Sequence, residues 1–214
     1  MWCCSKSAQL LFDTVLGFGG TETVSVNSGD NNPGTSSSSD SAKRRPDIII
    51  DSGYVGSEVV IIKNGLRLCG TGGALGSAPL VQTKSYFEVK VQQEGKWAVG
   101  VATRNSPLDV GPVGSDQYSW MLRHTGELYF NALSIGKLDP IPEEGDVVGI
   151  SFDHIELSFF INGKKGNITF TNVRGPIFPA VYVDEGAVLD VIFDSFLHPP
   201  PSGFDKIMKE KSIL

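Results

Sequence analysis

The stretch from residue 144 to residue 163, EGDVVGISFDHIELSFFING, constrains the fold of this chain more than any other. Apolar residues alternate with small or polar ones, and this period of two is typical of strands with one buried face. The alternating residues are Val148, Ile150 and Phe152, then Ile155, Leu157, Phe159 and Ile161. Asn162-Gly163 then supplies the positive φ angles that a two-residue hairpin turn demands. The stretch predicts an antiparallel meander, whose apolar core leaves function to loops and exposed faces.

The same pattern of short strands extends over most of the chain from Gly56 onward. Each segment is bounded by turn residues, and no long helical pattern appears before Pro199. The further expected strands are 58–63, 66–69, 85–92, 96–103, 118–123, 127–130, 177–184 and 187–194. This arrangement predicts an all-β sandwich of two sheets. Across its core, the apolar residues of 87–91 are expected to face those of 97–101.

The composition divides the chain into four parts. Residues 27–46 contain no aromatic residue and one aliphatic residue, Ala42, so they predict a flexible linker. We expect an N-terminal segment over 1–26, the main domain over 47–198, and a C-terminal proline turn with a short helix over 199–214. Ser202 is the expected cap of that helix, with Phe204, Ile207 and Met208 on the face that docks on the sandwich.

The N-terminal segment begins with MWCCSK and continues into an apolar stretch that Asp13 interrupts. Cys3 and Cys4 beside this stretch are candidates for palmitoylation, which would attach the chain peripherally to a membrane. Asp13 and the weakly charged start argue against a secretory signal peptide, and a frayed terminus is the alternative. We expect a cytoplasmic protein, membrane-associated if these cysteines are acylated.

Charge and motifs exclude several classes of function. The net charge of −6 argues against nucleic acid as a partner. The three histidines lie far apart with no cysteine near them, which predicts no metal site. The glycine-rich run 70–76 lacks the lysine and the following helix of a phosphate-binding loop. No nucleophile elbow is present, so the sequence predicts no cofactor and no enzymatic activity.

Five blocks in order carry a family resemblance, namely SYFEVKV at 85–91, EGKWAVGVA at 94–102, EGDVVGISFD at 144–153, SFFINGKKG at 158–166 and GPIFPAVYV at 175–183. Together they resemble a SPRY domain. The resemblance implies a bent, concanavalin-like antiparallel β-sandwich used for protein recognition, with ligand-binding loops gathered at one rim. It implies no enzymatic activity.

The resemblance also suggests where a partner would bind. Residues 116–122, DQYSWML, match a D-x-Y-x-x-x-L pattern that peptide-binding members use, which makes Tyr118 the first candidate contact and Trp120 a second. Two loops are the other candidates: 70–77, with Thr71 and Gly72, and 184–186, with Asp184 and Glu185. The first loop lacks an Arg-x-Pro element and the second lacks a tryptophan, so a different ligand is expected.

The sequence therefore predicts a non-catalytic, monomeric recognition module that binds a protein or peptide through rim loops. A glycan-binding lectin is the alternative, because sandwiches of this type also bind sugars on exposed aromatic side chains such as Tyr118 or Trp120. An enzyme would need polar groups converging in a pocket. The alternating strands predict an apolar interior without such a pocket.

Overall fold

The computed structural model describes residues 47–109 and 115–209, and this part of the chain is built almost entirely from antiparallel strands. The elements are β1 (Ile50–Val55), β2 (Glu58–Ile62), the 3₁₀ turn η1 (Lys63–Gly65), β3 (Arg67–Gly76), β4 (Ser85–Gln93), β5 (Lys96–Ala102), β6 (Ser119–Arg123), β7 (Glu127–Phe130), β8 (Leu133–Lys137), β9 (Val147–Phe152), β10 (Glu156–Ile161), β11 (Lys164–Thr171), β12 (Phe178–Asp184), β13 (Val188–Ile192) and β14 (Asp205–Lys206).

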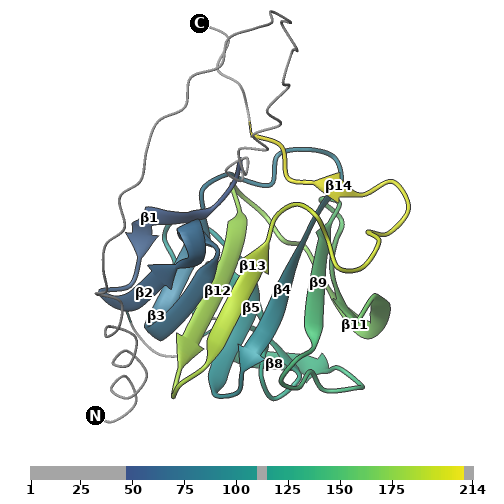
Figure 1. Cartoon of the computed structure of the whole chain (residues 1–214). Helices are drawn as coiled ribbons and strands as arrows, with labels where there is room; N and C mark the ends of the chain where they lie inside the picture. Colours follow the sequence, from purple (N-terminus) through teal and green to yellow (C-terminus); the bar gives the residue numbers. More distant parts are fainter. Residues whose placement is uncertain (1–46, 110–114, 210–214) are drawn as a thin grey trace, which may run out of the picture. The chain divides into compact units, whose positions relative to one another are not determined.

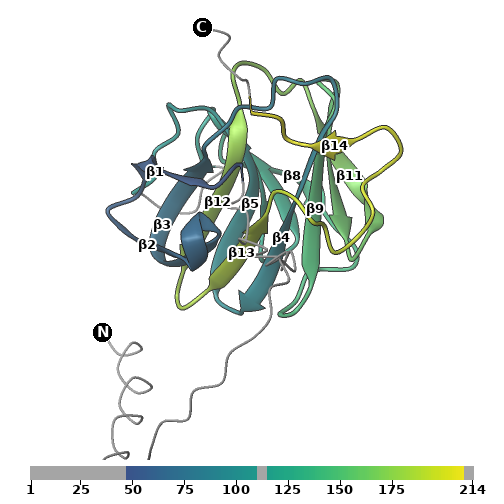
Figure 2. The same ribbon diagram turned by 45° about the horizontal axis from the view of Figure 1, so that its top comes forward.

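The strands form two layers, which confirms the predicted all-β sandwich (Figures 1 and 2). One layer, which we call the first sheet, runs in the order β1-β3-β12-β5-β6-β7-β8. The second sheet runs in the order β11-β10-β9-β4-β13-β3-β2, and β14 adds a short parallel pairing to β4. Both sheets therefore share β3.

The glycine-rich run 70–77 is not the rim loop that the sequence predicted, because residues up to Gly76 belong to β3. The first half of β3 pairs with β2 and β13 in the second sheet, and its second half pairs with β12 and β1 in the first. Gly70 and Gly72, at the crossing, have φ angles of 96° and 129°, which side chains rarely adopt. The glycines thus bend a strand from one sheet to the other.

The space between the sheets is filled by one apolar cluster. The expected partners are confirmed in it: Phe87, Val89 and Val91 from β4 and Trp97, Val99 and Val101 from β5 are all buried on opposing sheets. Burial of each such side chain contributes about 1.5–3 kcal/mol. Burial of the apolar side chains that alternate along these strands is therefore the main source of the fold's stability.

The predicted meander is also confirmed. β9 pairs with β10, and β10 pairs with β11 through the turn at Asn162 and Gly163, whose φ angles are 49° and 79°. In the turn between β9 and β10, Asp153 accepts backbone N–H groups from Ile155 at 3.0 Å and Glu156 at 2.8 Å.

The predicted C-terminal helix is wrong for the described residues. After the prolines at 199–201 the chain is extended, and Asp205–Lys206 form β14 beside the start of β4 (Figure 1). The amide of Gln82 holds this segment, because its Nε2 donates to the Lys206 carbonyl at 2.8 Å and its Oε1 accepts the Met208 N–H at 2.7 Å. Ile207 is buried as expected of a docked face, whereas Met208 is exposed. Side-chain bonds from a distant loop thus replace the hydrogen bonds of a helix.

Several predictions concern residues outside the described ranges. These are the acylation of Cys3 and Cys4, the flexible linker over 27–46, and the structure of residues 210–214. Within the described ranges, the structure contains no helix of the length and hydrophobicity that crossing a membrane requires.

Candidate functional site

The first sheet carries a second, smaller apolar cluster on its outer face, away from the main core. Its buried members are Leu75, Ala98, Ala102, Met121, Phe178, Ala180 and Tyr182. Strand alternation explains the cluster, since these residues occupy positions between the core-facing ones. Leu108, from the segment after β5, packs against it, and Arg104 lies over the rings of Tyr54 and Phe178 at 4.3 and 4.7 Å. The outer face is therefore partly covered by its own chain.

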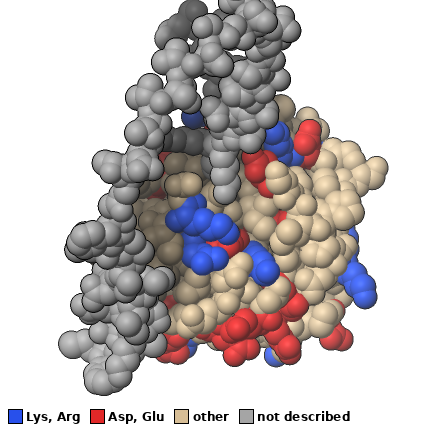
Figure 3. Space-filling view, in the orientation of Figure 1, with Lys and Arg blue, Asp and Glu red and all other residues tan. Residues whose placement is uncertain are grey.

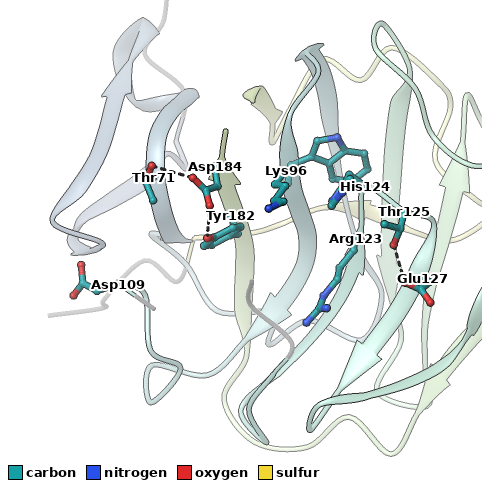
Figure 4. A pocket seen from close by; sticks show the side chains of 10 residues that line it. Thr71, Lys96, Asp109, Arg123, His124, Thr125, Glu127, Tyr182 and Asp184 are labelled. Carbon is teal, nitrogen blue, oxygen red and sulfur yellow. Dashed lines mark hydrogen bonds between the residues drawn. The ribbon is translucent and has the colours of Figure 1, made fainter. Parts of the chain in front are cut away.

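Where this cover ends, the outer face opens into a cavity of about 390 Å³, which we call the polar cavity (Figure 4). It is lined by Thr71, Lys96, Trp97, Asp109, Arg123, His124, Thr125, Glu127, Tyr182 and Asp184. These residues come from β3, β5 and β12, from the end of β6 through the start of β7, and, for Asp109, from the segment that follows β5. The cavity combines an apolar strand surface with charged groups, which suits it to bind a ligand.

Asp184, the last residue of β12, organises one wall of the polar cavity. Its carboxylate accepts hydrogen bonds from the Thr71 hydroxyl at 3.2 Å, the Tyr182 hydroxyl at 3.4 Å and the Glu185 N–H at 2.8 Å. Figure 4 shows Thr71 and Tyr182 converging on it. Burial, with the neighbouring carboxylate of Asp184, raises the pKa of Tyr182. The tyrosine is thus held protonated, as a hydrogen-bond donor.

Two cations face this wall. Lys96 is half exposed and forms an ion pair with Glu185, whose hydrogen bond raises the pKa of the lysine. Arg123 lies with its guanidinium carbon 3.5 Å from the centre of the Tyr129 ring and donates to the Ser115 hydroxyl at 3.2 Å. Burial lowers the pKa of Arg123, yet a guanidinium stays protonated at neutral pH.

Asp109 contributes a carboxylate from the segment that follows β5. It accepts the backbone N–H of Ser57 at 2.6 Å, and this bond lowers the pKa of Asp109. Asp109, Lys96, Tyr182 and Arg123 are the residues of the cavity lining whose pKa is shifted. Each of these four side chains keeps its ordinary protonation state at neutral pH. The pKa shifts of Lys96, Tyr182 and Asp109 all move away from 7. None of the shifted groups therefore titrates near neutral pH, as a general acid or base would require.

Comparison with known proteins identifies the family. The SPRY domain model matches residues 84–196. SPRY domain-containing protein 7 from Homo sapiens and from Mus musculus is 47% identical over 173 residues, which cover 80% of this chain and 88% of each relative. The chain belongs to the SPRY domain family. The resemblance inferred from the five sequence blocks is thereby confirmed, and SPRY domains generally bind protein or peptide partners.

A solved structure supports the SPRY fold as well. The stonustoxin structure superposes with a TM-score of 0.57 at 13% sequence identity, covering 68% of this chain and 27% of the stonustoxin chain. At this identity the likeness shows the fold alone, and this chain matches about a quarter of the toxin chain.

The SPRY domain brings some of the predicted contact residues together. Thr71 and Asp184 lie in the polar cavity, joined by their hydrogen bond, and Glu185 adjoins it through its ion pair with Lys96. Asp184 and Glu185 do lie at a turn, between β12 and β13, as predicted. Gly72 is instead buried in β3, where a side chain would meet Leu108 and Val59. It supplies space for the strand crossing rather than an exposed surface.

Trp120 does not offer its ring to a partner. It is only 6% exposed, belongs to the main core, and stacks on Phe130 with ring centres 5.1 Å apart. Trp120 and Leu122 are two residues apart in β6, so their side chains lie on the same face of the strand, which is the face toward the core. A sugar therefore cannot stack on Trp120, and the lectin alternative is not favoured.

Tyr118 lies at the end of β6 opposite to the polar cavity. It is half-buried, its N–H donates to Asp116 at 2.7 Å, and its hydroxyl accepts from the Gln117 amide at 3.1 Å. It lines neither the polar cavity nor the smaller cavity beside it. Its role in partner binding stays a prediction.

Lys96, Arg123 and Tyr182 were missed by the sequence reasoning, which expected no pocket with ionisable groups. A signal existed for Tyr182, because it is two residues from Asp184 and so shares its face of β12. The sequence-based prediction considered only the side chains of this strand that face the core. Among the described residues, the cavity holds no group of three His, Cys, Asp or Glu side chains placed to bind a metal ion.

Proposed function

We propose that this SPRY domain is a non-catalytic recognition module that binds a protein or peptide partner in the polar cavity. The observation that carries the proposal is the cavity's position: it opens on the outer face of the first sheet, with hydrogen-bonding groups from β3, β12 and β5 directed into it (Figure 4). Such a concave, partly apolar surface with a few oriented polar groups suits recognition of an extended chain.

The charge states support binding rather than catalysis. Lys96 is engaged by Glu185, and Tyr182 is engaged by Asp184. The raised pKa values of Lys96 and Tyr182 keep both groups protonated, so neither serves as a base or nucleophile. The two buried carboxylates of the described chain, Glu88 and Asp190, occupy outward positions of their strands, outside the apolar core.

The proposal is tested by charge reversal at two matched lysines in the full-length protein. Lys96 and Lys165 are exposed to similar extents, at 51% and 53%, and each pairs with one glutamate. Only Lys96 lines the polar cavity. Proximity labelling in cells is expected to lose its specific partners with Lys96→Glu and to retain them with Lys165→Glu. Tyr118→Ala, measured beside them, tests the contact that the sequence predicts at Tyr118.

Equal labelling by the wild type and Lys96→Glu would reject the polar cavity as the partner site. Thermal melting of each variant serves as the folding control, because an exposed ion pair contributes little to stability. Loss of partners in both lysine variants would indicate a nonspecific charge effect and would also count against the proposal.

A further inference from the structure

A second cavity of about 290 Å³ adjoins the polar cavity, and we call it the acidic cavity. It lies between the β4–β5 turn and the segment that leads into β9. Trp97 and His124 line both cavities, so the two lie next to each other at this end of the first sheet, and we call them together the groove. An extended ligand bound in the polar cavity would therefore lie within reach of the acidic one.

The charges of the groove are unbalanced. In the acidic cavity, the charged lining residues are Glu94, Glu143 and Glu144, with no lysine or arginine among the described lining residues. The polar cavity adds three carboxylates and only two cations. Figure 3 shows acidic side chains gathered along the edge of the molecule where β12 ends and β13 begins, the same end of the sandwich.

Two of the three glutamates have carboxylates that are free to form a salt bridge with a ligand. Glu144 accepts the Glu94 N–H at 2.9 Å and thereby orders the β4–β5 turn. Glu94 and Glu143 have exposed side chains, and no salt bridge involves either of them within the described ranges. Their negative charge is available to a partner.

Besides the glutamates and His124, the acidic cavity has an apolar wall. Ile141, 41% exposed, and Pro142 form one side, and the edge of Trp97 contributes at the boundary with the polar cavity. An apolar wall with carboxylates at its mouth matches a lysine or arginine side chain, which packs its aliphatic stem and presents a charged head.

We propose that the groove binds a basic peptide segment, with a lysine or arginine side chain seated in the acidic cavity. The inference rests on the proposed function of the polar cavity and specifies the chemistry of its partner. An acidic peptide is disfavoured at the same place, because like charges would be brought together at close range.

The test uses the full-length protein and a library of random decapeptides with one central position fixed as arginine, lysine, norleucine or glutamate. Norleucine keeps an aliphatic stem but lacks the charge. We expect the arginine and lysine pools to bind at least about tenfold more tightly than the norleucine pool, and the glutamate pool to bind weakest.

Two variants separate the inference from the proposed function. Glu94→Gln/Glu143→Gln keeps Glu144 and its bond to the turn, and is expected to abolish the preference for basic pools while weaker binding of all pools persists. Tyr182→Phe, in the polar cavity, removes a hydrogen-bonding hydroxyl without changing the charge of the groove, and is expected to weaken every pool. Glu58→Gln, an exposed glutamate on β2, is the matched control and should behave as the wild type.

Binding that Tyr182→Phe weakens but that shows no basic preference would overturn the inference and leave the proposed function standing. A basic preference that survives in Glu94→Gln/Glu143→Gln would likewise overturn it. Absence of binding by any pool would count against both.

Discussion

Asp190, on the outer face of β13, is a carboxylate with only 5% of its side chain exposed. It accepts from Arg67 Nη2 at 2.8 Å, from Lys63 at 2.7 Å and from the Gln92 amide at 3.1 Å. Burial acts to raise the pKa of Asp190, but the hydrogen bonds from Arg67 and Lys63 outweigh it and leave the pKa below its ordinary value. The charged form is therefore the one that the fold stabilises.

This lowered pKa predicts a pH dependence of stability. An aspartate with a lowered folded-state pKa contributes stability that is complete above its unfolded pKa of about 3.9 and is lost as the pH falls through the folded value. We expect Asp190→Asn to reduce the free energy of unfolding by about 1–3 kcal/mol at neutral pH. In thermal melts, this deficit should shrink as the pH falls below about 4.

The double variant Arg67→Gln/Asp190→Asn is the control, since it removes the carboxylate together with its arginine partner and, like Asp190→Asn, lacks the titrating group. Melting temperatures of the wild type and Asp190→Asn that remain parallel down to about pH 3 would show that the carboxylate carries no such linkage.

At the scale of elements, β3 shows how glycine serves the fold. A Cβ on Gly70 would lie 2.3 Å from the carbonyl oxygen of Glu58, in addition to the strain of its positive φ. Gly145 also has a positive φ, 91°, but a Cβ there would meet nothing within 4 Å. Comparing substitutions at these two glycines therefore distinguishes the cost of backbone strain from the cost of a steric clash.

Gly70→Ala is expected to destabilise the protein by at least about 3 kcal/mol, whereas Gly145→Ala should cost about 1 kcal/mol, the strain of positive φ alone. Urea unfolding monitored by tryptophan fluorescence measures both free energies. Equal costs for the two variants would mean that β3 relaxes away from the Glu58 carbonyl, and that close approach of the backbones is not what requires glycine.

Local patterns predicted most of the fold, because strand alternation and turn residues act within a few positions of one another. The meander through Asn162-Gly163 and the core positions of β4 and β5 are examples. The β3 crossing was mistaken for a loop because its glycines are required by close contacts with the backbone of Glu58 and Leu108. These contacts join residues that are distant in sequence, so the local pattern does not reveal them. The C-terminal helix failed similarly, since Gln82, over a hundred residues earlier, determines the extended conformation.

The candidate site was less predictable than the fold. Thr71 and Asp184 are 113 residues apart, and only the pairing of β3 with β12 joins them. Asp184 and Glu185 were found because turn residues are recognisable in sequence. Trp120 was misjudged because a tryptophan at the start of a strand fits either face, and its parity with Leu122 decides the matter.

At the scale of the whole molecule, the described core is self-contained. All buried apolar residues of the described ranges lie between Ile48 and Ile207, and β3 connects both sheets through one strand. Such a core is expected to unfold cooperatively, since neither sheet keeps a buried face without the other.

A fragment of residues 47–214 is therefore expected to fold alone and to melt within about 3 °C of the full chain, the shift that roughly 1 kcal/mol produces at this size. Differential scanning calorimetry measures both transitions. A fragment of residues 56–214 is the control, because it loses β1 and with it Ile48 and Ile50, each 2% exposed. Two buried isoleucines stabilise by several kcal/mol in total, about 2–5 each, so this shorter fragment should melt far lower. If both fragments melted equally far below the full chain, the N-terminal residues would contribute to the stability of the SPRY domain, and the core would extend beyond the residues that now define it.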